Sequence, residues 1–217
     1  MRPYLLPLLL AMLPALAAEA QPDSMPRHAT VFDLSGAVGP TLNYTSAAGW
    51  QLWGIDKKGR FQAGLGGRVS YFWSGRNEFD NQNGPGKAAL LTVEEPRLLA
   101  FNVAFHVRAR VAGPVSLGFN LDMLGATFGP DRSGMLLPDM PFQRPPRPVW
   151  NNLLLGGTAD RGSLNSEFYA SLALPHRLSL RGGWSHIVTA YEVDGTRYRR
   201  FHNLAVLGIS YRLPDKP

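Results

Sequence analysis

Basic and acidic side chains alternate with apolar ones along residues 100–123, which raises the question of what chemistry they could do. Arg108 and Arg110 follow His106 at every second position, and Asp122 comes after a short Ala-Gly-Pro segment. Guanidinium groups in a row can bind an anion, or they can pair with carboxylates inside a fold. Apolar residues fill most of the positions between them. A period of two is typical of a β-strand that has one apolar and one polar face.

A tight turn at Ala112-Gly113-Pro114 would fold this stretch back on itself as two paired strands. Pairing of Val111 with Val115 then fixes the register. The resulting partners are Arg108 with Gly118, His106 with Asn120, and Ala104 with Asp122. Other alternating stretches add charged residues to the polar face, and we predict a structural network inside the fold made by Arg68, His106, Arg108, Arg110, Asn120, Asp122, Glu167 and Arg181. A selective ion path through an arginine-rich interior is the alternative role.

The residue types needed for catalysis and metal binding are present but poorly spaced. The chain has no cysteine, which excludes thiolate ligands and a cysteine nucleophile. Ser185 and His186 are adjacent, and because neighbours on a strand point to opposite faces, they cannot act together as nucleophile and base. No G-x-S-x-G motif occurs, and the five histidines show no metal-ligand spacing. The sequence therefore predicts no catalytic residue, no metal site, no cofactor and no enzyme.

Eight segments carry the alternating pattern, which predicts an all-β protein. The predicted strands cover residues 31–44, 47–55, 60–73, 97–111, 115–128, 163–174, 178–191 and 199–213. Several connections are tight turns with Gly or Pro, whereas residues 74–96 and 129–162 form long loops. Prolines in the second loop exclude a regular strand through its centre. With these boundaries, the short turns and both termini fall at one end and the long loops at the other.

The first twenty residues have the three parts of a signal peptide. Met1-Arg2 is a short basic start, residues 5–16 are almost entirely apolar, and Ala18-Glu19-Ala20 is a small-x-small cleavage pattern. The apolar run is shorter than the roughly 20 residues that a membrane-spanning helix needs. We therefore expect export, with a signal peptide at 1–20, one domain at 21–213 and a short tail at 214–217. Export argues against nucleic acid as the partner of a chain with net charge +6.

The alternation leaves open which face lies inside, because a soluble barrel with an apolar ligand and a membrane barrel predict opposite orientations. Glycines lie on the polar face at Gly64, Gly66, Gly118, Gly183 and Gly208. Small residues suit the crowded interior of an eight-stranded barrel better than a water-facing surface. Aromatic residues also gather near the predicted strand ends, as in the girdles of membrane barrels. Both features favour apolar side chains on the outside.

On this pattern, over residues 30 to 213, the chain resembles small outer-membrane β-barrel proteins of the eight-stranded OmpA- and OmpX-like architecture, and those of Bacteroidota. The resemblance implies an antiparallel up-and-down transmembrane β-barrel, and hence a monomer in the outer membrane of a Gram-negative cell, in contact with outer-membrane lipid and with the barrel assembly machinery. Tyr211 would then be the terminal aromatic residue that this machinery reads.

The expected function is a structural or surface-interaction role with a filled polar lumen. The long loops 74–96 and 129–162 would be extracellular, and loop 129–162 could contact an extracellular or cell-envelope partner. Three alternatives remain open: a soluble periplasmic barrel that binds an apolar ligand, a small-solute channel, and an outer-membrane lipid-modifying enzyme.

Overall fold

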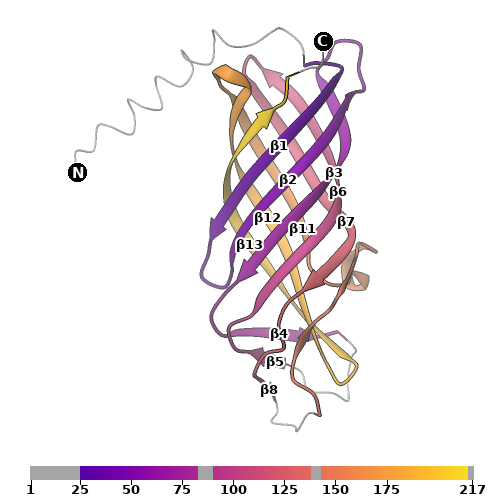
Figure 1. Ribbon diagram of the computed structural model, residues 1–217, viewed down its shortest axis with the longest axis vertical. Coiled ribbons are helices and arrows are strands. Elements are labelled where there is room, and N and C mark those ends of the chain that lie inside the picture. The colour runs from indigo at the N-terminus through magenta and orange to yellow at the C-terminus, as the bar shows by residue number, and fades with distance from the viewer. Residues whose placement is uncertain (1–24, 83–89, 138–142, 215–217) are drawn as a thin grey trace, which may run out of the picture.

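The chain forms a closed antiparallel β-barrel of eight strands, as predicted (Figure 1). The computed structural model describes residues 25–82, 90–137 and 143–214, so the predicted signal peptide lies outside the described residues. The barrel strands are β1 (His28–Val38), β2 (Asn43–Gly54), β3 (Phe61–Trp73), β6 (Arg97–Ala112), β7 (Val115–Phe128), β11 (Leu164–Ala173), β12 (Leu178–Val193) and β13 (Thr196–Arg212). Each pairs with the next, and β13 pairs with β1 to close the barrel.

The sequence prediction placed the turns of two hairpins wrongly. The first strand was expected to reach residue 44, but it ends at Val38, and residues 39–42 form the turn before β2. The last two strands were expected to flank a loop at 192–198. Instead they form one continuous hairpin with a turn at Asp194-Gly195, both at positive φ, 47° and 77°. Such a turn matches the right-handed twist of paired strands, which lets the ladder run to its tip.

The long loops fold into short strands that add to this extended hairpin. Strands β4 (Asn77–Asn81), β5 (Leu90–Val93) and β8 (Gly134–Leu137) continue the sheet from β13. Strand β9 (Arg147–Pro148) pairs with β12, and β10 (Asn151–Leu153) pairs with β7. As expected from its prolines, the described part of this loop has no regular strand through its centre, and only short strands form towards its two ends. Pro148 takes an edge position, where it need not donate a hydrogen bond.

We call this structure the cap: the described parts of residues 74–96 and 129–162 together with residues 191–198. It lies at one end of the barrel, and so does the short β1–β2 turn, contrary to the expectation that the short turns share the other end, because successive connections of an antiparallel barrel alternate between its ends (Figure 1). The β2–β3, β6–β7 and β11–β12 turns and the described chain ends lie at that other end, which we call the turn end. One turn there contains the 3-10 turn η2 (Pro175–Arg177), and η1 (Gly157–Ala159) belongs to the cap. None of the described helical segments is long or apolar enough to cross a membrane.

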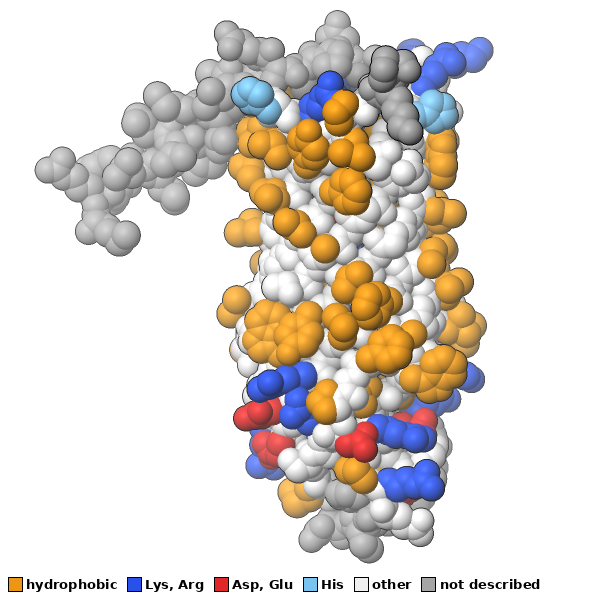
Figure 2. All heavy atoms as spheres, in the orientation of Figure 1, with side chains coloured by type: hydrophobic (Ala, Val, Ile, Leu, Met, Phe, Trp, Pro, Cys, Tyr) orange, Lys and Arg blue, Asp and Glu red, His pale blue; other side chains and the backbone are white. Residues whose placement is uncertain are grey.

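Apolar side chains cover the outside of the barrel wall. Leu207 is 76% exposed and Phe32 is 51% exposed, although both lie in the middle of regular strands. Figure 2 shows hydrophobic side chains along the barrel and charged side chains on the cap below them. We call this outer surface the apolar belt, and its members include Phe32, Leu34, Leu65, Phe101, Phe119, Phe168, Leu180, Trp184, Leu207 and Ile209.

A β-bulge in β7 changes which of its residues face inward. Ala104 pairs with Asp122, but the next residue towards the cap, Val103, pairs with Leu124, so Met123 is the extra residue. A bulge shifts the period of two by one position. Thr127 is therefore buried after the bulge, whereas Asp122 is buried before it.

Candidate functional site: the polar interior of the barrel

A first ion-pair cluster joins three strands across the middle of the barrel. Arg181 on β12 bonds with Nη1 to Asp33 Oδ2 on β1, and with Nη2 to Glu167 Oε1 on β11 at 2.6 Å. Trp50 donates its indole N–H to Asp33 Oδ2 at 2.6 Å. All four side chains are at most 5% exposed. Buried charges require partners of this kind, because an isolated ion inside a fold is strongly disfavoured.

A second cluster lies on the neighbouring strands and contains one arginine, one carboxylate and two asparagines. Arg68 Nε lies 3.0 Å from Asp122 Oδ1, and Arg68 Nη2 donates to Asn120 Oδ1 at 2.6 Å. Asn102 donates to Asp122 Oδ2 at 2.8 Å. The predicted register of β6 and β7 is what brings these groups together, since Arg108 faces Gly118, His106 faces Asn120 and Ala104 faces Asp122, as expected. Across the two clusters, two arginines meet three carboxylates.

His106 occupies the space between the two clusters. Its Nε2 lies 2.6 Å from the Tyr169 hydroxyl, and its ring packs edge-on against Trp50 with centroids 4.6 Å apart. The Tyr169 ring in turn lies where a side chain at Gly118 would be, because a Cβ there would come within 2.2 Å of Tyr169 Cζ. A glycine on the inward face therefore makes room for a large side chain from the neighbouring strand.

The eight predicted network residues all lie on the inward face, but they divide into two groups. Arg68, His106, Asn120, Asp122, Glu167 and Arg181 belong to the buried middle, which we call the charged layer together with Asp33, Trp50, Asn102 and Tyr169. Arg108 and Arg110 lie nearer the turns and line an open cavity. Arg108 Nη2 donates to Gln62 Oε1 at 2.7 Å. Both arginines thus lie at the cavity and outside the charged layer.

Sequence reasoning missed several members of the charged layer. Asp33 is a lone acid on the polar side of an alternating strand, a signal that was available. Trp50 was grouped with interfacial aromatics, but it is 1% exposed and lies inside the barrel. It precedes the outward Trp53 by an odd number of residues, so the two rings point to opposite faces.

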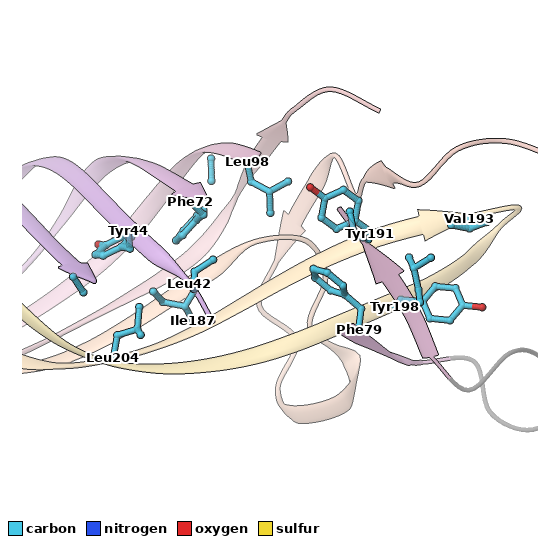
Figure 3. Close-up of a cluster of buried hydrophobic side chains, with 14 of the residues drawn as sticks. Leu42, Tyr44, Phe72, Phe79, Leu98, Ile187, Tyr191, Val193, Tyr198 and Leu204 are labelled. Atoms are coloured by element: carbon cyan, nitrogen blue, oxygen red, sulfur yellow. The ribbon is translucent and has the colours of Figure 1, made fainter. Parts of the chain in front are cut away.

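Apolar residues close the barrel at the cap end. Leu42, Tyr44, Phe72, Ile187 and Leu204 are buried at this end of the barrel, and the same cluster continues through cap residues (Figure 3). Phe79 packs edge-on against Tyr191 with centroids 5.1 Å apart. Burial raises the pKa of the Tyr191 phenol, which keeps it neutral. The described cap is therefore a packed extension of the barrel interior.

An ion pair joins two strands on the outer surface of the cap. Arg147 on β9 donates to Glu192 Oε1 on β12 at 2.9 Å. This hydrogen bond and the nearby charge raise the pKa of Arg147. Both side chains are partly exposed, so the pair joins the edge strand to the hairpin without contributing much to overall stability.

Ser185 and His186 do not contact each other as a nucleophile and its base would. Ser185 is buried and His186 is exposed, so they lie on opposite faces. His186 Nδ1 lies 2.8 Å from Asn203 Oδ1. Ser166, on the strand beside His186, donates to the backbone carbonyl of His186 at 3.4 Å and not to its ring.

The arrangement of the interior is suited to filling the barrel. Within the described ranges, no group of three or more histidine or acidic side chains could hold a metal ion. The charged layer satisfies most of its charges internally, through contacts between strands that are far apart in sequence. No protein-family model and no curated protein matches this chain.

Proposed function

We propose that this protein is an exported outer-membrane β-barrel protein of a Gram-negative cell, in which the barrel is a filled structural support and the cap is the interacting surface. The observation that carries this proposal is the orientation of the wall: the apolar belt faces outward and the charged layer faces inward. A signal peptide at residues 1–20 would direct export. Cofactors and catalytic residues have no part in this function.

The apolar belt favours lipid as its surroundings. Soluble monomers rarely expose contiguous apolar patches above a few hundred Å². Burial of apolar surface is worth roughly 25 cal/mol per Å², so contact with hydrocarbon would favour this wall strongly. The soluble alternative needs an apolar interior for its ligand, whereas the middle of this barrel contains two ion-pair clusters.

The lengths and connections of the strands fit the same proposal. The shortest barrel strand, β11, has 10 residues and the longest, β13, has 17. A tilted membrane strand needs about 9–11 residues. Outer-membrane barrels have short periplasmic turns and longer extracellular loops, which assigns the turn end to the periplasm and the cap to the exterior. Loop 129–162 then forms part of the surface available to an extracellular or cell-envelope partner.

Substitution in the apolar belt separates the membrane and soluble proposals, because they expect opposite results. Leu207→Arg adds a charge at a position that is 76% exposed in the wall. In lipid, an arginine near the bilayer midplane costs about 2–4 kcal/mol, whereas in water an exposed Leu-to-Arg change is nearly neutral. The measurement is the free energy of unfolding in phosphatidylcholine vesicles by denaturant titration.

Met135→Arg is the matched control, because Met135 is 37% exposed on β8 in the cap, outside the barrel wall. An exposed side chain in water tolerates such a change at a cost within about 0.5 kcal/mol. Equal effects at both positions, or a protein that stays soluble without detergent after cell fractionation, would contradict the membrane proposal.

Planar-bilayer recording tests the filled lumen against the small-solute channel. The apolar cluster and the charged layer both occupy the barrel, so we expect no steady current from the intact protein. A steady, ion-selective current would favour the channel instead. Lipid analysis of deletion and overexpression strains tests the lipid-modifying alternative in the same way: unchanged lipid A supports the structural role.

A further inference from the structure

An open cleft of about 480 Å³ lies where the barrel wall meets the cap. It forms at the ends of three neighbouring strands, because Trp73, the last residue of β3, pairs with Asn43 on β2 and with Arg97 on β6. The described residues that line the cleft include Asn43, Tyr71, Trp73, Ser74, Glu95 and Arg97. The lining therefore combines two aromatic rings from the wall with polar side chains from the wall and the cap.

Tyr71 and Trp73 form the apolar side of the cleft. They flank Phe72, which is buried in the apolar cluster inside the barrel (Figure 3), so both rings point outward. The two rings stack on each other, with centroids 5.4 Å apart and an angle of 23° between their planes. Tyr71 is 39% exposed. A flat apolar surface is thus available directly beside the polar groups.

The polar side of the cleft offers hydrogen-bond donors and acceptors side by side. Arg97 Nη2 lies 3.4 Å from Glu95 Oε2, and both side chains are more than half exposed, at 54% and 66%. So long and exposed an ion pair leaves most donors of the guanidinium and most lone pairs of the carboxylate available to a ligand. The amide of Asn43 and the hydroxyl of Ser74 each add a group that can both donate and accept.

The chain holds Glu95 in the cleft at a conformational cost. Glu95 has φ 45°, in the left-handed region, and it precedes Pro96, whose ring favours an extended residue before it. Glycine would adopt this backbone conformation without the cost. Strained residues of this kind cluster at ligand-binding sites. Folding of the loop alone does not favour a glutamate here, whereas a need for its carboxylate in the cleft does.

We propose that this cleft is a binding site for a neutral pyranose sugar. A sugar ring has an apolar C–H face that packs on aromatic rings, and a rim of hydroxyls that both donate and accept hydrogen bonds. A phosphate group mainly accepts, and Glu95 would repel it. A metal cation would find a single carboxylate with the guanidinium of Arg97 beside it. An acyl chain would gain nothing from the charged pair.

The sugar can belong to a soluble glycan or to the headgroup of a glycolipid, since both present the same ring. The cleft borders the apolar belt, so a lipid headgroup could reach it if the wall lies in a membrane. That source rests on the proposed function, whereas recognition of the sugar ring by the cleft does not.

Saturation-transfer NMR on the full chain in amine-oxide micelles, which contain no sugar, tests the site. The probe is cellotetraose, a soluble chain of β-linked glucose rings. We expect saturable binding, with the strongest transfer to the protons on one face of a glucose ring. Trp73→Leu keeps an apolar side chain but removes the flat ring, and it should weaken binding about tenfold, which corresponds to about 1.4 kcal/mol. Trp150→Leu is the matched control, because Trp150 is 71% exposed and is not among the described residues that line the cleft.

Glu95→Gly separates binding from folding. It removes the carboxylate together with the backbone strain, so we expect weaker binding at a denaturant midpoint equal to or above that of the wild type. Glu94→Gln is the control with the same change in charge, because Glu94 is exposed, pairs with Arg76 and is not among the described residues that line the cleft. Binding by Glu95→Gly as tight as that of the wild type would remove Glu95 from the site and overturn the proposal.

A second experiment distinguishes the two sources of the sugar. Native mass spectrometry of protein released from lipid nanodiscs compares retention of monoglucosyldiacylglycerol with that of diacylglycerol with the same acyl chains. Selective retention of the glucosyl lipid supports a glycolipid headgroup, and binding of cellotetraose alone supports a soluble glycan. Binding of neither probe, equal weakening in Trp73→Leu and Trp150→Leu, or even transfer to both faces of the sugar overturns the proposal. Binding of cellotetraose in micelles can succeed or fail whatever the result of the Leu207→Arg test in lipid.

Discussion

The two ends of this barrel differ in the side chains that line the interior: they are apolar at the cap end and largely basic at the turn end. At the cap end, apolar side chains from the barrel continue without a break into the cap, and Phe79 and Tyr191 pack there as in a soluble core. At the turn end, the inward residues surround an open cavity lined by basic groups. The charged layer separates these two regions and shares its strands with both.

This difference shows how one alternating pattern can serve three purposes along the same strands. An inward position carries an apolar residue where the cap covers the barrel, an ion pair in the middle of the wall, and a basic residue at the open cavity. β6 demonstrates the sequence of environments: Leu98 lies in the apolar cluster, His106 in the charged layer and Arg108 at the cavity. We therefore expect function at the two ends of the barrel, because the charged groups in its middle form ion pairs with one another.

The largest effect is expected from breaking the charged layer that separates the ends. Arg181→Met keeps the length of the side chain but leaves Asp33 and Glu167 buried without their cation. Removing one partner of a buried pair typically costs about 3–5 kcal/mol, because the remaining charge is not compensated. The measurement is the free energy of unfolding in vesicles by denaturant titration.

A triple variant provides the control for this prediction. Adding Asp33→Asn and Glu167→Gln to Arg181→Met removes the uncompensated charges, so most of the lost stability should return. If the single variant is as stable as the wild type, the charged layer does not hold the barrel together, and its distinction from the cavity loses its basis.

An effect of similar size, but confined to the cap, is expected from truncating a side chain at the apolar end. Phe79→Ala removes a fully buried ring from the cap, and such truncations cost about 3–5 kcal/mol in a rigid core. Because Phe79 lies in the cap, we expect most of this loss as opening of the cap while the barrel stays folded. Faster proteolysis within the cap, with an unchanged barrel unfolding transition, is the expected result.

Phe128→Ala is a suitable comparison, because Phe128 is 56% exposed at the cap end of β7. It should leave cap proteolysis unchanged. A common loss of the whole barrel in Phe79→Ala would instead mean that the cap and the barrel unfold as one unit, so that the cap end differs less from the middle than we infer.

Much of the barrel wall could be predicted from the sequence. A period of two with one apolar face predicts a strand directly, and the Ala-Gly-Pro turn was enough to place Arg108 against Gly118 and Ala104 against Asp122. The register held although the turn itself contains an irregularity: Ala112, not Val111, pairs with Val115. The inward position of the predicted network followed from the same pattern.

The parts that could not be read depend on contacts between distant segments. The short cap strands form because the β12–β13 hairpin offers its edges for pairing. The hairpin itself is an exception, because its Asp194-Gly195 pair is a strong local turn signal from which it could have been predicted. The bulge at Met123 is a response to packing across strands. The sign of the cavity charge could not be predicted because the β11–β12 turn had to be brought against Arg108 first.

The tip of the β12–β13 hairpin gives a prediction with a loss of stability of intermediate size. Gly195 has φ 77° with open space around it, so Gly195→Ala strains the backbone without a clash. The expected cost is about 1 kcal/mol, confined to the cap. Hydrogen exchange of residues 191–198 should become faster. Gly75→Ala, also in open space but without a positive φ, should leave this exchange unchanged; equal effects would mean that the turn geometry does not determine how the cap forms.

The smallest effect is expected at the turn end, in the β2–β3 connection. Asp56 Oδ1 accepts the backbone N–H groups of Phe61 and Arg60, both at 2.8 Å. The N–H of Phe61 is the main cause that lowers the pKa of Asp56 below its usual 3.8. A carboxyl whose pKa is lowered on folding stabilises the fold above its unfolded pKa, and this contribution is lost as the pH falls through the folded pKa.

Asp56→Ala should therefore be slightly less stable than the wild type at about pH 7, and the gap should narrow at about pH 3. The denaturant midpoint at the two pH values measures it, with Lys57→Ala as the control in the same exposed turn. A gap that is equal at both pH values would assign the effect to turn conformation and not to the carboxylate. Because this turn lies outside the wall, Asp56→Ala should leave both the charged layer and the cap intact. The change in its denaturant midpoint therefore measures the small contribution of a short turn to stability, compared with that of the interior.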